Sequence, residues 1–158
     1  MEVSMEQQVA AAATNIEDHR IGGYHVYRRA AQLSDGTNGV TLSWRNETIG
    51  PFRAVRDVLD YQLEPLVHAV LEDGSHALYR WSTRIDKALE ITRLHLCHSR
   101  PLYIVRRAHG TFVKWNARVS GPYEEIGAFE ATRAGVRFPV LRDGDHQQIT
   151  LALATVSR

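Results

Sequence analysis

The sequence predicts an α+β domain built on an antiparallel β-sheet of about six or seven strands. Two observations lead to this class. Runs rich in β-branched and aromatic residues, separated by turn-forming residues, fill both ends of the chain, and a segment between them has apolar residues at three- and four-residue spacing. We expect residues 21–158 to form a single α+β domain and residues 1–20 to form a peripheral N-terminal segment.

Segments 23–32, 39–46 and 75–83 and several runs after residue 101 are expected to be strands. The first two are joined by LSDGTNG, which indicates a hairpin with a long loop. Turn formers such as Asp-Gly-Asp separate the later runs, and short connections favour antiparallel pairing. Pro139 lies inside one of these runs, so its strand should lie at a sheet edge or carry a bulge.

Residues 51–72 are expected to form a central amphipathic helix. Its apolar stripe consists of Phe52, Val55, Leu59, Leu63, Leu66 and Val70. Pro51 suits the first helical turn, and Pro65 should kink the helix or split it in two. Residues 84–97 fit both a helical spacing and part of a strand alternation, and we favour a second helix there.

Charge is distributed unevenly along the chain although the net charge is only +1. Residues 76–118 contain nine basic and two acidic side chains, whereas the rest contains ten basic and sixteen acidic ones. Such a block indicates a basic face for phosphates or for an acidic partner. The alternative is internal compensation, in which the basic block packs against the acidic parts of the chain.

The stretch RRAHGTFVKWNAR, residues 106–118, interleaves cations with aromatic rings. A hairpin turn at His109-Gly110 would place alternate residues on opposite faces, one of them a core face with Leu102, Ile104, Val113 and Trp115. On the other face, rings beside cations suit single-stranded nucleic acid, in which bases stack and phosphates carry charge. The alternative is a sheet face covered by other elements, with the basic stems lying along it. The predicted contact residues are Tyr103, Arg107, Phe112, Lys114, Arg118, Arg80 and Arg106.

Two hairpins resemble each other in sequence. The segment from YHVYRRA to SWRN (24–46) and the segment from YIVRRA to KWNAR (103–118) both carry an Arg-Arg-Ala strand followed by a strand with tryptophan near Asn and Arg. The similarity indicates either a duplicated hairpin unit or chance likeness between amphipathic hairpins.

An enzyme is the less favoured interpretation. The segment LYRWSTR (78–84) resembles the arginine-bearing first strand of toxin-type ADP-ribosyltransferases, and HGT (109–111) resembles the nicotinamide-site strand of the polymerase-type members. The resemblance implies an NAD-dependent transferase that uses Arg80 or His109 with a glutamate from residues 124–130. The sequence contains neither a phosphate-binding glycine loop nor a serine elbow.

Cys97 is the only cysteine, which excludes an internal disulfide framework and fits a reducing compartment. We expect it to be buried and chemically inert. His95 and His98 lie near it, but no second ligand pair stands at a zinc spacing, so no metal and no cofactor is expected. No apolar run reaches the roughly 20 residues of a membrane span, and the first residues lack the positive charge of a signal peptide. A cytoplasmic protein without a membrane partner is therefore expected.

The function that follows from these patterns is a non-catalytic binding or regulatory module that uses the surface at 76–118. Single-stranded nucleic acid is the first ligand class and an acidic protein partner the second. The alternatives are a structural assembly subunit, including a homo-oligomer, and the NAD-dependent transferase.

Overall fold

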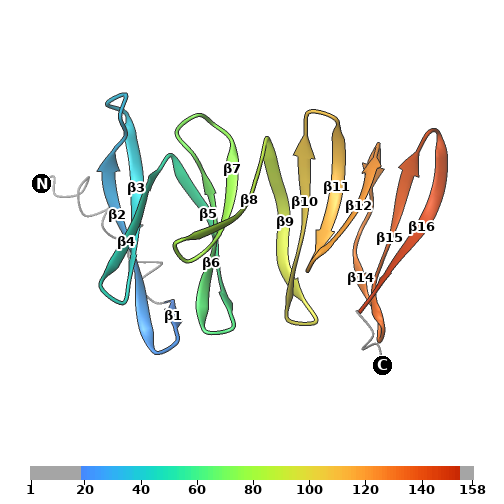
Figure 1. The fold of residues 1–158 in the computed structure, drawn as a ribbon, viewed down its shortest axis with the longest axis horizontal. Helices are drawn as coiled ribbons and strands as arrows, with labels where there is room; N and C mark the ends of the chain where they lie inside the picture. Colours follow the sequence, from blue (N-terminus) through green and yellow to red (C-terminus); the bar gives the residue numbers. More distant parts are fainter. Residues whose placement is uncertain (1–18, 154–158) are drawn as a thin grey trace, which may run out of the picture. The chain divides into compact units, whose positions relative to one another are not determined.

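The computed structural model describes residues 19–153, and this part of the chain consists of strands and their connections. Sixteen strands form four antiparallel sheets that follow one another along the chain (Figure 1). No helix occurs between residues 19 and 153, so the predicted α+β class is wrong and the fold is all-β. Nearly all of the predicted peripheral segment, residues 1–20, lies outside the described residues.

The chain divides into two compact units, the first ending at Lys87 and the second beginning at Ala88. The first unit holds two sheets. The first sheet pairs β1 (Arg20–Ile21), β2 (Tyr24–Gln32), β3 (Asn38–Trp44) and β4 (Glu47–Phe52) in that order. The second sheet pairs β5 (Ala54–Tyr61), β6 (Glu64–Val70), β7 (His76–Arg80) and β8 (Thr83–Ala88). The strands predicted at 23–32, 39–46 and 75–83 are confirmed as β2, β3 and β7.

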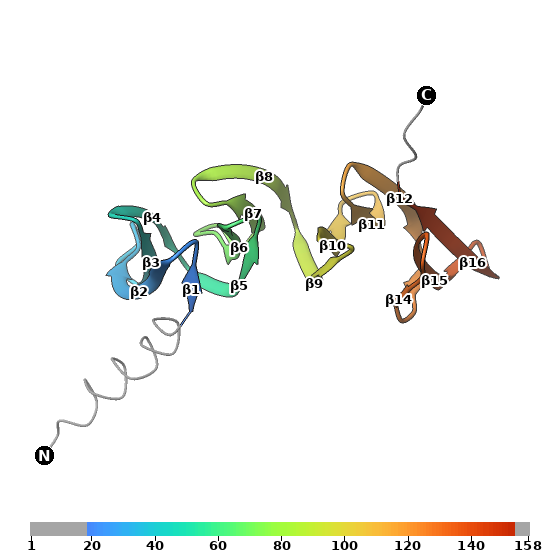
Figure 2. The ribbon, with the colours of Figure 1, turned by 90° about the horizontal axis from the view of Figure 1, so that it is seen from below.

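The second unit also holds two sheets. The third sheet pairs β9 (Glu90–Cys97), β10 (Arg100–Arg107), β11 (Gly110–Trp115) and β12 (Arg118–Tyr123). In the fourth sheet, the short strands β13 (Glu125–Ile126) and β14 (Glu130–Ala131) pair with one side of β15 (Gly135–Arg142), and β16 (Asp145–Ala152) pairs with its other side. Strands β14, β15 and β16 lie side by side in both views of this sheet (Figure 1, Figure 2).

The segment predicted as a central helix, residues 51–72, forms the end of β4, then β5, a two-residue turn and β6. The pairing of β5 with β6 shifts register between Val55 and Asp57. Because this bulge inserts an extra residue, Val55 and Val58 both reach the core although they lie three positions apart. The bulged strand thus has the apolar spacing of a helix.

The segment predicted as a second helix, residues 84–97, forms β8 without its first residue and the whole of β9. Arg93 lies inside β9 with a φ of 58°, and the pairing of β9 with β10 shifts register between Leu102 and Ile104. This irregularity interrupts the two-residue alternation that identifies a strand from sequence. The helical prediction for this segment is therefore wrong for the same reason as the first.

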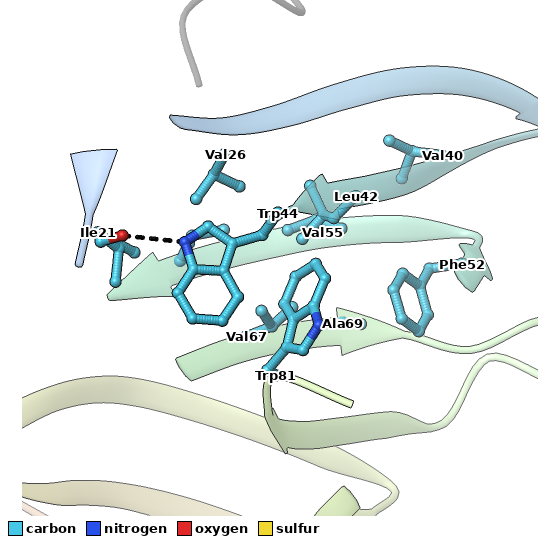
Figure 3. Packing of buried hydrophobic residues seen from close by; sticks show 11 residues of the cluster. Ile21, Val26, Val40, Leu42, Trp44, Phe52, Val55, Val67, Ala69 and Trp81 are labelled. Carbon is cyan, nitrogen blue, oxygen red and sulfur yellow. Dashed lines mark hydrogen bonds between the residues drawn. The ribbon is translucent and has the colours of Figure 1, made fainter. Parts of the chain in front are cut away.

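Each unit has its own hydrophobic core. In the first unit, side chains from both sheets pack around Trp44 and Trp81, whose ring centroids lie 5.4 Å apart (Figure 3). The Trp81 indole Nε1 donates to Glu47 Oε1 at 2.8 Å, which joins the second sheet to the first. In the second unit, side chains of the third and fourth sheets pack around Trp115 and Phe138. Both cores hold apolar side chains together with a tryptophan whose N–H has a partner, as buried indoles require.

The two hairpins that resemble each other in sequence occupy equivalent places in their sheets. Each supplies the second and third strands, and each third strand ends in tryptophan. Trp44 Nε1 donates to the carbonyl of Ile21, which ends β1, at 2.9 Å (Figure 3). Trp115 Nε1 donates to the carbonyl of Cys97, which ends β9, at 3.0 Å. The same bond in the same place favours the duplicated-unit interpretation over chance.

A second pattern follows both tryptophans. Gly-Pro and an aromatic residue come at the same distance along the chain, as Gly50-Pro51-Phe52 after Trp44 and as Gly121-Pro122-Tyr123 after Trp115. The strand register places Val26 opposite Trp44 and Leu102 opposite Trp115. When the two hairpins are aligned by their tryptophans, residues in equivalent places of the two sheets coincide. The Arg-Arg pairs, which make the sequences look alike, do not coincide in this alignment.

Candidate nucleic-acid interface

The residues predicted to contact nucleic acid are divided between the two units. Arg80 ends β7 in the first unit. The other six lie on β10, β11 and β12 in the second unit, and they are Tyr103, Arg106, Arg107, Phe112, Lys114 and Arg118.

The predicted hairpin of residues 106–118 is present as β10 and β11, with a different register. Arg107 pairs with Gly110, so the two turn residues are Ala108 and His109, and the predicted turn at His109-Gly110 is wrong by one residue. Because the change moves each cross-strand pair by two positions, the division into faces is unaffected. The predicted core face, with Leu102, Ile104, Val113 and Trp115, is confirmed.

The other face of this hairpin does not present its rings to solvent. Tyr103 is only 5% exposed and Phe112 only 8%. Arg106 is exposed, and its Nε lies 3.3 Å from Glu90 Oε1 in an ion pair. Arg118 is also exposed. The hairpin thus offers cations at its surface, but the two rings predicted to stack on bases, Tyr103 and Phe112, are covered.

The guanidinium of Arg80 is held by its neighbours in the first unit. Its Nε donates to Glu64 Oε1 at 2.5 Å and its Nη2 donates to Gln62 Oε1 at 2.9 Å. The same guanidinium lies 4.9 Å from the centre of the Tyr61 ring. These contacts connect the end of β7 to the β5–β6 turn and occupy the guanidinium of Arg80.

A surface that the sequence analysis did not single out lies on the first sheet. Alternation along β2 and β3 places Val26 and Leu42 in the core, so Tyr27, Arg29 and Ser43 point to the opposite side. We call this side, with the end of the β1–β2 turn and the β3–β4 turn beside it, the polar face of the first sheet. It contains a hollow of about 630 Å³.

Exposed aromatic rings line the hollow. Tyr24 is 51% exposed and Tyr27 is 38% exposed, and the ring of His25 lies 5.9 Å from that of Tyr27. The guanidinium of Arg45 lies 5.2 Å from the centre of the Tyr24 ring and 5.3 Å from that of Trp44. Such cation–π contacts hold the arginine and the tyrosine together without consuming the positive charge.

The hollow is electrostatically positive. Its lining includes Arg29 and Arg45 and no carboxylate, and neither arginine makes an ion pair within residues 19–153. At the rim, Arg20 Nη2 lies 3.1 Å from His25 Nε2. Hydroxyl groups complete the lining, contributed by Thr41, Ser43 and Thr48. Guanidinium groups bind phosphate in a bidentate manner, and exposed rings stack on planar ligands.

The equivalent face of the third sheet has different side chains. Matching the sheets by their tryptophans places Tyr27 with Tyr103, Arg29 with Val105, and Thr41 with Phe112. Val105 and Phe112 are apolar and buried, whereas Arg29 is exposed and Thr41 half-buried. An exposed polar face with aromatic rings is therefore a feature of the first sheet that its internal counterpart does not share.

Another polar cluster is a chain of hydrogen bonds in the second sheet. His68 Nδ1 lies 3.0 Å from Asp57 Oδ2, and His68 Nε2 lies 2.8 Å from His76 Nδ1. Burial lowers the pKa of His68 below its usual value, and the bonded carboxylate of Asp57 opposes that effect. Within residues 19–153, no three His, Cys, Asp or Glu side chains are grouped to hold a metal ion.

Cys97 ends β9 inside the core of the second unit, which confirms its predicted burial. Burial raises the pKa of its thiol, so little of it is thiolate at neutral pH. The backbone carbonyl of the same residue accepts the Trp115 bond.

We expect the native protein to react slowly with a thiol reagent at neutral pH, because the reactive species is an accessible thiolate and Cys97 supplies neither the exposure nor the charge. The measurement is the labelling rate in buffer compared with the rate in denaturant. Native labelling close to the denatured rate would contradict the burial of this side chain.

Comparison with known proteins finds no family model, no curated protein and no solved structure that matches this chain. Within residues 19–153 there is no helix long and apolar enough to cross a membrane.

Proposed function

We propose that the protein is a non-catalytic binding module that contacts single-stranded nucleic acid through the polar face of the first sheet. One observation carries the proposal: the exposed rings of Tyr24 and Tyr27 stand beside Arg29 and Arg45 in a hollow to which residues 19–153 contribute no carboxylate. Cations along a groove and rings that stack on bases are the two features that single-stranded nucleic acid requires.

The arginines and the tyrosines of the hollow are expected to make separable contributions to the affinity for nucleic acid. Phosphate contacts act on any sequence and release counterions, so their strength falls with salt. Base stacking is worth about 1–3 kcal/mol per ring and depends little on salt. Of the two tyrosines, Tyr27 suits such a test better, because Tyr24 also contacts Arg45 and Trp44 within the first sheet.

Arg29→Ala is expected to weaken binding to all oligonucleotides alike and to flatten the slope of log affinity against log salt by roughly 0.7. Tyr27→Ala is expected to cost about 1–3 kcal/mol of binding free energy and to leave that slope nearly unchanged. The measurement is fluorescence anisotropy of a labelled single-stranded oligonucleotide across a salt series.

Arg118→Ala is the matched control, because Arg118 is an exposed cation on the predicted basic stretch and lies outside the hollow. If Arg118→Ala weakens binding and Arg29→Ala does not, the interface belongs to the second unit. Absence of binding by the wild-type protein at low salt would end the nucleic-acid proposal, since electrostatic attraction is strongest there.

An acidic protein partner is the second candidate, favoured by the same two arginines, which form no ion pair with any described residue. Carboxylates pair with guanidinium groups but do not stack on rings. For such a partner, Arg29→Ala would weaken binding, Tyr27→Ala would have little effect, and an oligonucleotide would not compete.

A further inference from the structure

Strand β16 has one unused edge. Its eight residues pair with β15 without a register shift, from Asp145 opposite Arg142 to Ala152 opposite Gly135. Its other side pairs with no strand in the part of the chain that the structure describes. An unpaired edge of this length is a template for another strand.

The register shows which backbone groups face the open edge. Gly127 N donates to the Pro139 carbonyl and Glu124 N donates to the Leu141 carbonyl, so odd-numbered residues of β15 point toward β13 and β14. The even-numbered residues of β15 therefore bond to β16, and they pair with its odd-numbered residues. It follows that Gln148 and Thr150 direct their N–H and C=O groups outward.

The other edge strands carry features that oppose pairing. Strands β4 and β12 contain Gly-Pro, and β5 and β9 contain bulges. Strand β8 carries Arg84 and Lys87, and β1, β13 and β14 have two residues each. Proline, bulges, basic side chains and shortness are the usual protections of a sheet edge.

Strand β16, with the sequence DHQQITLA, has none of these protections. It contains no proline, lysine or arginine, and its pairing with β15 is regular throughout. Its only carboxylate, Asp145, lies at one end. The contrast with the other edges singles out β16 as the edge on which another strand would add.

We propose that β16 pairs with β16 of a second copy of the chain, in antiparallel orientation. Residues whose backbone N–H and C=O groups face the open edge must lie opposite one another for the two strands to form hydrogen bonds. In one such register, Gln148 lies opposite Thr150 of the second copy, and Ile149 lies opposite Ile149 of the second copy. A parallel in-register pair would instead bring the two Asp145 carboxylates together.

Two further features fit this occupant. Ile149 and Leu151 are half-buried against the core of the second unit, so pairing at Ile149 would extend an apolar side that already exists. An antiparallel pair related by a two-fold axis uses both open edges at once and leaves neither for further addition. The result is a closed dimer in which the fourth sheets of the two copies form one continuous sheet, joined at the two β16 strands.

Paired substitutions test the register. In Q148E/T150E, each carboxylate would face a carboxylate of the second copy at both symmetric positions, whereas in Q148K/T150E each would face a lysine. Thr150 lies opposite Arg137 on β15, and Gln148 lies opposite Pro139, so glutamate at 150 is compatible with the fold of the chain itself. The two variants differ at one position only and are matched in burial.

The measurement is sedimentation equilibrium of the full chain over a concentration series, with circular dichroism to show that each variant is folded. We expect a monomer–dimer equilibrium for the wild type, a dissociation constant raised about tenfold or more in Q148E/T150E, and recovery in Q148K/T150E. A wild type that stays monomeric at every concentration would overturn the proposal. A dimer unaffected by Q148E/T150E would show that the copies meet elsewhere and would overturn it as well.

Discussion

Leu66→Ala is expected to lower the free energy of unfolding by about 2–5 kcal/mol, and Leu63→Ala by less than about 0.5 kcal/mol. Leu66 lies on β6 and is fully buried, whereas Leu63 lies in the β5–β6 turn and is 67% exposed. A helix with the apolar stripe of residues 51–72 would bury both leucines. Urea denaturation of the two variants and the wild type measures the difference.

A third variant sharpens the comparison. Leu63 has a φ of 66°, in the left-handed region that favours glycine. Leu63→Gly is therefore expected to leave stability unchanged or to raise it, whereas glycine inside a helix would cost about 1 kcal/mol. Equal losses in Leu63→Ala and Leu66→Ala, with a further loss in Leu63→Gly, would contradict the β5–β6 hairpin.

Regular strands were predictable because their signal is local. In β2, β3 and β7, residues suited to strands are bounded by turn formers, and no bulge interrupts the pairing of β2 with β3 or of β6 with β7. The bulges at Val55 and Arg93 are different, since they are defined by the partner strand and cannot be recognised from the alternation of one segment alone. A bulged strand and a helix then give the same apolar spacing.

The prediction that the strand of Pro139 lies at a sheet edge or carries a bulge was wrong. This strand, β15, has partners on both sides and is not an edge. The irregularity lies in the partner, where β13 ends and β14 has not begun, and Gly127 N donates to the Pro139 carbonyl in this gap. A Cβ on Gly127 would lie 2.5 Å from Pro139 Cγ, so glycine permits the close approach. The proline therefore coincides with the break between β13 and β14, while its own strand pairs regularly with β16.

The candidate site was predictable in its chemistry and not in its place. Both duplicated hairpins carry tyrosines and arginines, and the charge block favoured the hairpin of residues 103–118. Exposure depends on packing by distant residues, which leaves Tyr103 buried and Tyr27 accessible although they occupy equivalent positions. The residues that share a face with each tyrosine distinguish the two hairpins in sequence. Apolar Val105 and Phe112 accompany the buried Tyr103, whereas polar Arg29 and Thr41 accompany the exposed Tyr27.

Trp115→Ala is expected to lower the free energy of unfolding by about 3–5 kcal/mol. The ring is almost completely buried in the core of the second unit, and its Nε1 supplies the hydrogen bond to the Cys97 carbonyl. Trp115→Phe keeps most of the packing and leaves that buried carbonyl without its donor, so we expect a loss of about 1–3 kcal/mol from that variant. Denaturant unfolding followed by circular dichroism measures both, because removing Trp115 alters the fluorescence itself.

Val119→Ala provides the matched control, since Val119 lies on the adjacent strand β12 and is exposed. Its expected effect is within about 0.5 kcal/mol. The labelling rate of Cys97 gives an independent measure, because loss of the Trp115 ring removes a neighbour in the same cluster and the bond at the end of β9. Trp115→Ala should therefore speed labelling while Val119→Ala does not. A Trp115→Ala variant as stable as Val119→Ala would mean that the indole does not fasten β11 to the end of β9, and the equivalent role of Trp44 at Ile21 would lose its support.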